Sequence, residues 1–380
     1  MKIIIISTYI PQKCGIATYS NDLYKSLIKT TTNHTINIIA VTENGSYKYP
    51  SEVVATINKE SKENYIYQAN FINNNYDICI LQHEFGIFGG LSGEHIIELT
   101  SRLCIPLLTN FHTTLDNPTK KQSYIIDALH KASDTITVMT ESAIKLMKKQ
   151  FNIKDEKMKL IHHGVPIFDI DQKKAKTKLN LPTSKILILS FGFLSKGKGF
   201  ETAIDAIAKI SDLNFLYIIL GSTHPNIIKK DGEEYREFLH QRISNLRVDN
   251  KILMINKFAD NKELKLYLAA CDIYITPYPN KNQTSSGTLS FAVGAGAAVI
   301  STPYHYAKDL LNHNRGLLFN FNDPTQLAFL IDTLINNPVV LQKYRTNAKT
   351  YGKTIQWPII AKQLLIILQK TIKNNKTCLK

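Results

Sequence analysis

Short apolar runs alternate with amphipathic segments along almost the whole chain. The runs are rich in Ile, Val and Leu and predict buried strands, whereas the segments between them have apolar residues at helical spacing. Apolar strands bridged by helices indicate parallel sheets that are covered on both faces. The sequence therefore predicts an α/β protein.

Two series of elements follow one another along the chain. The strands of the first are expected at Lys2–Ser7, Thr35–Val41, Tyr76–Gln82, Pro106–Asn110, Asp134–Met139 and Met158–Ile161. Those of the second are expected at Lys185–Phe191, Phe215–Leu220, Lys251–Ile255, Asp272–Thr276, Ala298–Ser301 and Gly316–Phe319. Helical spacing occurs at Ala17–Ile28, Gly93–Ser101, Gln122–His130, Glu141–Gln150, Phe200–Ile210, Tyr235–Leu246, Lys262–Ala270 and Pro324–Ile335.

The two series predict two Rossmann-like domains, as the length of 380 residues also suggests. Residues 1–166 are expected to form the first and residues 167–356 the second, with a polar, lysine-rich stretch at the boundary. The final helix, from Trp357 to about Lys373, has one apolar face. The C-terminal segment 357–380 is therefore expected to pack back on the first domain.

The stretch from Asn282 to Ser301 carries the clearest chemistry. A polar loop follows a predicted strand there and enters a helix built of small residues; it contains Thr284, Ser285, Ser286, Gly287 and Thr288. The first N–H groups of a helix have no intrahelical partner and lie at the positive end of its dipole. This loop is therefore a candidate phosphate site.

Two further loops have glycines at predicted strand ends. Gly15 lies in the loop after the first strand, where it permits either a close approach of a ligand or a tight turn. The segment from Phe191 to Gly199 contains Lys196 and Lys198, and glycines with positive charge at a helix start suit a diphosphate. Neither loop has the G-x-G-x-x-G fingerprint or the P-loop spacing, which argues against a nicotinamide cofactor.

Ionisable residues stand at three other predicted strand ends. His83 and Glu84 precede a glycine-rich aromatic segment, where they are candidates for sugar binding or proton transfer, or where Glu84 is only a cap. His112 follows a strand, and His163 belongs to a histidine pair that closes the first domain. No third residue with suitable spacing joins that pair, so a metal site is not predicted.

Composition and charge restrict the protein class. Hydrophobic residues make up 44% of the chain and charged residues 20%, as in globular proteins, and no apolar run is long enough to span a bilayer. The apolar start, Met1–Ser7, is too short for a signal peptide and is interpreted as a strand. The five cysteines are scattered and unpaired in spacing, which predicts a reducing, cytoplasmic location.

The formal net charge of +15 is uneven. Residues 1–160 carry 17 basic and 15 acidic residues, whereas the remaining 220 carry 29 and 16. A lysine-rich solvated surface explains this excess most simply, and attraction of an anionic substrate, an anionic membrane surface or nucleic acid are the alternatives. Aromatic and basic residues are not interleaved, which disfavours nucleic acid.

Together these segments resemble glycosyltransferase family 4 (group 1), the retaining, nucleotide-sugar-dependent enzymes with the GT-B fold. The resemblance covers nearly the whole chain and rests on the order and spacing of its markers, which are Pro11–Gly15, His112, Ile161–Val165, Gly192–Gly199, Ala270–Ile273, residues 282–296, Arg315–Leu318 and Trp357–Ala361. It implies a cleft between the two domains, with the nucleoside diphosphate sugar on the second domain and the acceptor on the first. It also implies metal-independent hexosyl transfer to a carbohydrate or lipid-linked acceptor.

The resemblance assigns roles by position. Lys198 and the N–H groups of residues 285–288 would neutralise the departing diphosphate, and Gly15 would approach the same phosphates. His112 would contact the transferred sugar. Asn282, Thr284, Lys196 and Ser290 are the nearest further candidates for donor binding, Glu84 for catalysis, and His83 and His163 for the acceptor side.

Two departures from the family pattern leave alternatives open. The family has two glutamates eight positions apart where this chain has Asn282 and Ser290, and an arginine where it has Phe193. A catalytically weak protein that binds sugars or nucleotide sugars is therefore the second hypothesis, and a DNA-modifying glycosyltransferase is the third. The hydroxyl-rich loop favours an active enzyme of polysaccharide or glycoconjugate biosynthesis.

Overall fold

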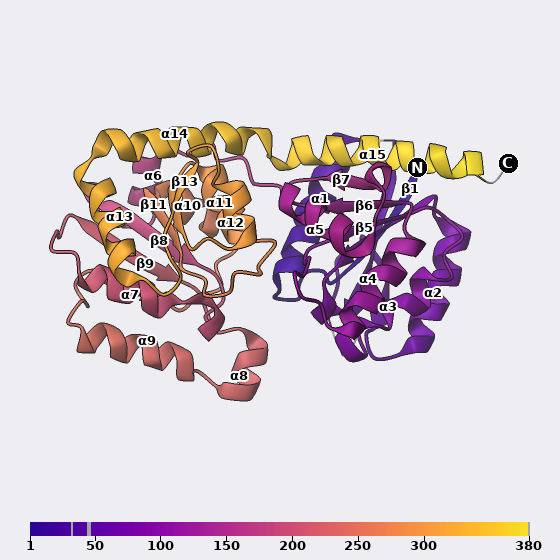
Figure 1. The fold of residues 1–380 in the computed structure, drawn as a ribbon, viewed down its shortest axis with the longest axis horizontal. Helices are drawn as coiled ribbons and strands as arrows, with labels where there is room; N and C mark the ends of the chain where they lie inside the picture. The colour runs from indigo at the N-terminus through magenta and orange to yellow at the C-terminus, as the bar shows by residue number, and fades with distance from the viewer. Residues whose placement is uncertain (32, 44–46, 379–380) are drawn as a thin grey trace. The chain divides into compact units, whose positions relative to one another are not determined.

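A computed structural model of the chain describes residues 1–31, 33–43 and 47–378 (Figure 1). The chain divides into two compact units, here called unit 1 (Met1–Gly164 with Trp357–Lys380) and unit 2 (Val165–Gln356). Each unit contains one parallel sheet, and helices connect most of its consecutive strands. The predicted α/β class with two Rossmann-like domains is confirmed. Residues 379 and 380 of the expected C-terminal segment lie outside the described residues.

Unit 1 has a seven-stranded sheet in the order β3-β2-β1-β4-β5-β6-β7. Its strands are β1 (Lys2–Ser7), β2 (Thr35–Thr42), β3 (Val53–Asn58), β4 (Ile78–His83), β5 (Leu107–Phe111), β6 (Thr135–Val138) and β7 (Met158–Leu160). Its helices are α1 (Gly15–Thr30), α2 (Lys62–Asn75), α3 (Ile96–Thr100), α4 (Lys120–Ala132), α5 (Glu141–Phe151) and α15 (Trp357–Cys378), with short 3₁₀ turns at η1 (Phe85–Ile87), η2 (Leu91–Gly93) and η3 (Asp155–Lys157).

Unit 2 has a six-stranded sheet in the order β10-β9-β8-β11-β12-β13. Its strands are β8 (Ile186–Phe191), β9 (Phe215–Leu220), β10 (Ile252–Ile255), β11 (Ile273–Thr276), β12 (Ala298–Ser301) and β13 (Gly316–Leu318). Its helices are α6 (Gln172–Lys178), α7 (Phe200–Ala208), α8 (Pro225–Asp231), α9 (Glu234–Asn245), α10 (Asn261–Ala270), α11 (Gly287–Ala295), α12 (His305–Leu310), α13 (Pro324–Asn336) and α14 (Pro338–Thr354), with a 3₁₀ turn at η4 (Lys196–Lys198).

Both sheets reverse their strand order at one point, between β1 and β4 in unit 1 and between β8 and β11 in unit 2. The loops that leave the carboxyl ends of two such strands diverge, and the crevice between them is where ligands bind in open parallel sheets. The positions of these reversals thus select the loops after β1 and β4 and those after β8 and β11.

Helix α15 belongs to unit 1, as its apolar face predicted. The Tyr19 and Trp357 rings meet edge to face with centroids 5.1 Å apart, which joins α1 to the start of α15. Farther along, Oγ1 of Thr371 lies 2.8 Å from Oγ1 of Thr135 on β6. These contacts fix the C-terminal helix against the first sheet.

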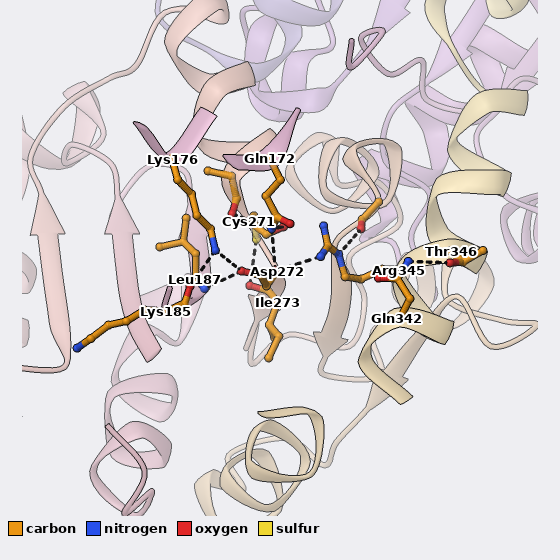
Figure 2. Close-up of polar contacts among 12 residues, drawn as sticks. Gln172, Lys176, Lys185, Leu187, Cys271, Asp272, Ile273, Gln342, Arg345 and Thr346 are labelled. Atoms are coloured by element: carbon orange, nitrogen blue, oxygen red, sulfur yellow. Dashed lines mark hydrogen bonds and ion pairs between the residues drawn. The ribbon is translucent and has the colours of Figure 1, made fainter. Parts of the chain in front are cut away.

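A buried cluster of charges holds unit 2 together (Figure 2). The Oδ2 atom of Asp272, just before β11, accepts hydrogen bonds from Nζ of Lys176 at 2.8 Å and from the Leu187 N–H at 2.9 Å. Its Oδ1 atom accepts from Nε2 of Gln172 at 2.7 Å and from Nη1 of Arg345 at 3.1 Å. One carboxylate therefore links α6, β8 and α14 to β11. Helix α6 lies in the lysine-rich stretch that was interpreted from the sequence as the boundary between the domains.

Small residues allow α11 to pack closely, as its composition predicted. A Cβ atom on Gly294 would lie 2.7 Å from a methyl group of Val165, and one on Gly352 of α14 would lie 2.7 Å from Cα of Gly294. Helix α11, which follows the polar loop, therefore packs closely against Val165 and α14.

Among the described residues, none of the helices combines the length and the apolar character that crossing a bilayer requires.

Candidate active site

The loop between β11 and α11 leaves the strand-order reversal of unit 2. Ser286 caps the helix, because its Oγ atom accepts the N–H of Leu289 at 3.3 Å. The carbonyl of Gln283 accepts the N–H of Tyr306 at 3.1 Å, which ties the loop to α12. The N–H groups of Gly287 and Thr288 open the helix and have no carbonyl within it to bind. Their position is that of an anion site.

Lys198 lies beside this loop. Its Nζ atom is 4.1 Å from the centroid of the Tyr278 ring, and the Tyr278 hydroxyl lies 3.0 Å from Oγ1 of Thr288. Oγ1 of Thr288 in turn lies 3.1 Å from Oγ of Ser286. A half-buried cation and the first amides of α11 therefore lie close together within unit 2, linked through one aromatic ring.

Sequence reasoning missed Tyr278. The residue stands between Pro277 and Pro279, just beyond the strand predicted at Asp272–Thr276. Its ring stacks on that of Tyr304, with centroids 5.4 Å apart, and this second ring is fully buried. An aromatic residue directly after a buried strand at the strand-order reversal was the available signal.

The other predicted donor-side residues differ in position. Lys196 is exposed and pairs with Glu234 at 3.2 Å. Thr284 is buried, and the carbonyl of Ser285 accepts from the Gln283 side chain at 2.9 Å. Asn282 is half-buried, and its Oδ1 atom has no hydrogen-bond partner among the described residues.

The structure does not support the prediction that Ser290 binds the donor. Its side chain is fully buried, its hydroxyl donates to the carbonyl of Ser286 at 2.9 Å, and it lies 2.6 Å from the hydroxyl of Tyr306. A hydroxyl held in this way inside the unit does not reach a ligand. We therefore do not assign Ser290 to donor binding.

In unit 1, His112 follows β5 directly, as predicted, and is buried. Oε1 of Gln82 accepts from Nδ2 of Asn110 and lies 2.8 Å from Nε2 of His112. Asn110 is oriented by Thr137, whose hydroxyl donates to its Oδ1 atom at 2.9 Å. Because Oε1 of Gln82 can only accept a hydrogen bond, we infer that Nε2 of His112 carries the proton and that Nδ1 is an acceptor.

Burial also determines the charge of this histidine. Burial, with neighbouring His163 and His83 adding to it, lowers the pKa of His112 to about 3 from 6.5. The ring is therefore neutral near pH 7. The Tyr19 ring meets it edge to face with centroids 4.6 Å apart and meets His163 in the same way at 5.0 Å.

His163 joins this cluster of aromatic rings, and its Nδ1 atom lies 2.8 Å from the carbonyl of Gly164. Burial lowers its pKa to about 4.

The backbone of Gly15, at the start of α1, is open on its side-chain face, since a Cβ atom there would meet nothing within 4 Å. Neither packing nor a positive φ requires a glycine at this position.

Glu84 and His83 have structural contacts. Glu84 caps η1, where its carboxylate accepts from the N–H of Phe85 at 3.1 Å and from the hydroxyl of Thr113, and burial raises its pKa. His83 is fully buried against the rings of Phe85, Phe88 and Phe111. We therefore do not assign His83 to the acceptor side, because a ring so enclosed cannot contact a ligand. Glu84 therefore has the capping role that the sequence analysis gave as the alternative to sugar binding or proton transfer.

No group of three or more His, Cys, Asp or Glu side chains within residues 1–31, 33–43 and 47–378 has an arrangement that could hold a metal ion. A comparison with known families finds a match within unit 2. The family described as "Glycosyl transferases group 1" matches residues 171–354, which lie within unit 2. Unit 2 is thus similar to this family over nearly its whole length.

Two curated relatives match part of the chain. It is 29% identical over 220 residues to the teichoic acid glycerol-phosphate primase of Bacillus subtilis, covering 55% of this chain and 49% of that protein. It is 24% identical over 165 residues to the lipopolysaccharide core biosynthesis glycosyltransferase LpsE of Rhizobium meliloti, covering 42% of each. The match thus spans half or less of the length of these relatives.

Solved structures match the fold of the whole chain. The crystal structure of HepE of Anabaena in complex with UDP and glucose has a TM-score of 0.77 at 16% identity, covering 97% of this chain and 100% of that one. The sucrose-phosphate synthase of Thermosynechococcus elongatus has a TM-score of 0.80 at 15% identity, covering 98% and 100%. At these identities the likeness is one of fold alone.

Unit 2 has a cation and helix-start amides beside α11 but lacks the three charged groups that the resemblance to the family led us to expect. Asn282 and Ser290 stand in place of glutamates, and the Ser290 hydroxyl is bound within unit 2. Phe193 stands in place of an arginine, and its ring packs against His224 and Phe258. Lys198 is thus the predicted diphosphate cation that lies beside the loop.

Proposed function

We propose that the chain transfers a hexosyl group from a nucleoside diphosphate sugar to a carbohydrate or lipid-linked acceptor, with retention of configuration and without a metal ion. The reaction would take place in the cytoplasm, in polysaccharide or glycoconjugate biosynthesis. The observation that carries this proposal is the position of Lys198, 4.1 Å from the Tyr278 ring and next to the first amides of α11.

The proposed chemistry follows from where charge develops. When the glycosidic bond to the diphosphate breaks, negative charge grows on the departing phosphate. Donors fixed in position before the reaction stabilise that charge more than they stabilise the substrate. The N–H groups of Gly287 and Thr288 and the ammonium of Lys198 are such donors.

His112 would act on the transferred sugar. Its proton lies on Nε2, bound to Gln82, so Nδ1 can accept a hydrogen bond from a sugar hydroxyl. Because burial keeps the ring neutral near pH 7, it would orient the hydroxyl without adding a charge. Gly15, with open space above its Cα atom, would let donor phosphates approach the start of α1.

Three comparisons support this proposal. The group 1 family match identifies the domain type, and HepE was crystallised with UDP and glucose. One curated relative is named as a teichoic acid glycerol-phosphate primase and the other as a lipopolysaccharide core biosynthesis glycosyltransferase. A lipid-linked acceptor at an anionic membrane surface would also suit the excess of basic residues after residue 160.

A nucleotide-release assay tests the proposal. The full chain is incubated with UDP-, GDP-, ADP- and TDP-sugars, with and without saccharide or lipid-linked acceptors, and released nucleoside diphosphate is measured. Acceptor-dependent release is expected from the wild type. It should fall by about a hundredfold in Lys198→Ala, the size of effect seen on removing one fixed oxyanion donor.

A second candidate function is binding of a sugar or nucleotide sugar with little transfer. The burial of the Ser290 hydroxyl against Tyr306 favours it, because no polar group then replaces the second glutamate. Saturable binding of a nucleotide sugar, with no release beyond its spontaneous hydrolysis for any acceptor, would establish this second function instead.

A further inference from the structure

A groove with a volume of about 840 Å³ opens on the surface of unit 1; it is here called the α4 groove. Three segments form its walls: the last part of the loop from β5 to α4, one face of α4, and the end of α5. Asp116 and Asn117 line it from the loop, and Gln150 lines it from α5. The groove is separate from the proposed phosphate site, which belongs to unit 2.

The face of α4 in this groove combines an aromatic ring with polar groups. Tyr124 and Asp127 follow Lys120 by four and seven residues, so the three side chains share one face of the helix. Tyr124 is 56% exposed, and Nζ of Lys121 lies 5.4 Å from the centroid of its ring. The groove therefore contains apolar ring surface that a ligand can cover.

The loop that carries Asp116 is fixed on both sides of this residue. Before it, the hydroxyl of Thr113 donates to the carboxylate of Glu84. After it, Thr119 closes a capping box at the start of α4. Nε2 of Gln150 donates to the carbonyl of Asp116, which ties the loop to α5. The groove is thus held in position before a ligand binds, which lowers the entropic cost of binding.

The charges of the groove are nearly balanced. Asp127 pairs with Lys131 at 2.6 Å, and Lys120 lies in the groove with Asp116. One cation then stands beside each carboxylate along the lining. Such a surface gives little net attraction to either an anionic or a cationic ligand, so we expect a neutral one.

The polar groups of the lining suit a ligand with many hydroxyls. Ionised carboxylates such as those of Asp116 and Asp127 only accept hydrogen bonds, whereas the side-chain amides of Asn117 and Asn152 both donate and accept. A sugar hydroxyl also donates and accepts, so it needs partners of both kinds. The C–H groups on one face of a sugar ring form an apolar surface that packs on an aromatic ring such as that of Tyr124.

We propose that the α4 groove binds a neutral saccharide chain, with a sugar ring packed on Tyr124 and its hydroxyls bound by the carboxylates and amides of the lining. This inference rests on the proposed function where it takes the chain to be the part of the acceptor that lies beyond the reacting end. Asp116 follows His112 by four residues, a span of at most about 14 Å even for an extended backbone. An oligosaccharide that receives its sugar beside His112 is therefore long enough to extend into the groove.

Saturation-transfer NMR titration of the full chain tests the binding site. The probes are neutral hexasaccharides of glucose, mannose, galactose and N-acetylglucosamine. The variants are Tyr124→Ala and Asp127→Asn, with Tyr67→Ala as the matched control. Tyr67 is 68% exposed on α2 of the same unit and stands outside the lining.

We expect Tyr124→Ala to weaken the hexasaccharide that binds best by about three- to tenfold, the range of a single aromatic contact. Asp127→Asn should act in the same direction, because a neutral amide accepts hydrogen bonds less strongly than a carboxylate. Tyr67→Ala should leave binding within twofold, and none of the variants should change binding of a nucleoside diphosphate. If no hexasaccharide bound the wild type, or if both groove variants bound like the wild type, the inference would be overturned.

Acceptor kinetics separate this inference from the proposed function. With a hexasaccharide acceptor, Tyr124→Ala should raise KM by about three- to tenfold and leave kcat unchanged, since the groove contacts no reacting atom. An unaltered KM in Tyr124→Ala would overturn the inference and leave the transferase in place. Hexasaccharide binding that depends on Tyr124, without transfer by the wild type, would support the saccharide site and remove the proposed function.

Discussion

The ammonium of Lys198 lies over the ring of Tyr278, with Nζ 4.1 Å from the ring centroid. The hydroxyl of that ring contacts Thr288, so the ring connects the cation to the start of α11. No carboxylate is recorded within ion-pair distance of Lys198 among the described residues, whereas Lys196 has Glu234. A cation held by a neutral ring keeps its charge available to an anionic ligand.

Tyr278 should therefore act on anion binding through Lys198. Tyr278→Leu removes the ring and is expected to weaken binding of nucleoside diphosphate and of pyrophosphate by about three- to thirtyfold, the range of a cation–π contact. Tyr278→Phe keeps the ring and loses only the contact with Thr288, so its loss should be smaller. Calorimetric titration measures both.

The dependence on Lys198 can be isolated with a double-mutant cycle. In a Lys198→Ala background, Tyr278→Leu should cost little further affinity, since the cation that the ring positions is already absent. Additive losses in the double variant would show that Tyr278 supports the loop independently of Lys198.

Gln82 should set the tautomer of His112. Oε1 of Gln82 accepts from Asn110, so it can only accept the proton of Nε2 from His112. Nitrogen chemical shifts of the wild-type protein should show His112 protonated on Nε2. In Gln82→Glu, the added carboxylate should raise the pKa of His112, because an opposite charge favours the imidazolium.

Thr113→Val is a suitable control for that titration, since Thr113 also follows β5 but its hydroxyl bonds Glu84 and not His112. The proposed hydrogen bond from Nε2 of His112 to Gln82 would be contradicted if wild-type His112 were protonated on Nδ1, or if Gln82→Glu left the pKa of His112 unchanged.

Unit 1 should lose stability in mild acid. Burial lowers the pKa of His83 and His112 to about 3 and that of His163 to about 4, from 6.5. Below pH 6.5 the unfolded chain binds protons that these folded groups do not. The free energy of unfolding should therefore fall as pH decreases from about 6.5 toward 4, and these groups should not change it above pH 7.

Urea unfolding at pH 7.5, 6.0 and 5.0 measures this effect. The fluorescence of Trp357, the one tryptophan in the sequence, reports on unit 1. His83→Leu removes one of the three groups and should make the decline shallower. Equal midpoints at pH 7.5 and 5.0 would show that these histidines are not buried in neutral form.

Asp272 should be essential for the stability of unit 2. Asp272→Asn would leave Lys176, which is 5% exposed, without its buried carboxylate. Removing one partner of a buried ion pair typically costs about 3–5 kcal/mol. Glu234→Gln breaks the exposed pair with Lys196 and should cost less than about 1 kcal/mol. Urea unfolding followed by circular dichroism compares the two, and similar losses would contradict the structural role of Asp272.

The pattern of apolar residues predicted most of the fold but not its less regular elements. The edge strand β3 was missed because its burial alternates and, of its six residues, Ile57 alone is buried. Helix α2 was missed because it is rich in Asn, a poor helix former, and is held by the burial of Tyr65, Ala69 and Ile72. In both cases tertiary packing, which sequence spacing does not record, decides the structure.

The candidate site was predictable where it depends on backbone N–H groups. A polar loop between an apolar strand and a small-residue helix indicated amides at a helix start, and the structure has them at Gly287 and Thr288. Side-chain direction was not predictable. Ser290 lies one helical turn beyond Ser286, yet only the structure shows that its hydroxyl is bound to Tyr306.

The central claim is that a donor diphosphate binds at the start of α11, beside Lys198. A crystal structure of the full chain with the nucleoside diphosphate that binds best tests it most directly. The account predicts phosphate oxygens within hydrogen-bond distance of the N–H groups of Gly287 and Thr288 and of Nζ of Lys198. A diphosphate bound elsewhere, with Lys198 still resting on Tyr278 and the first amides of α11 in contact with water alone, would contradict it.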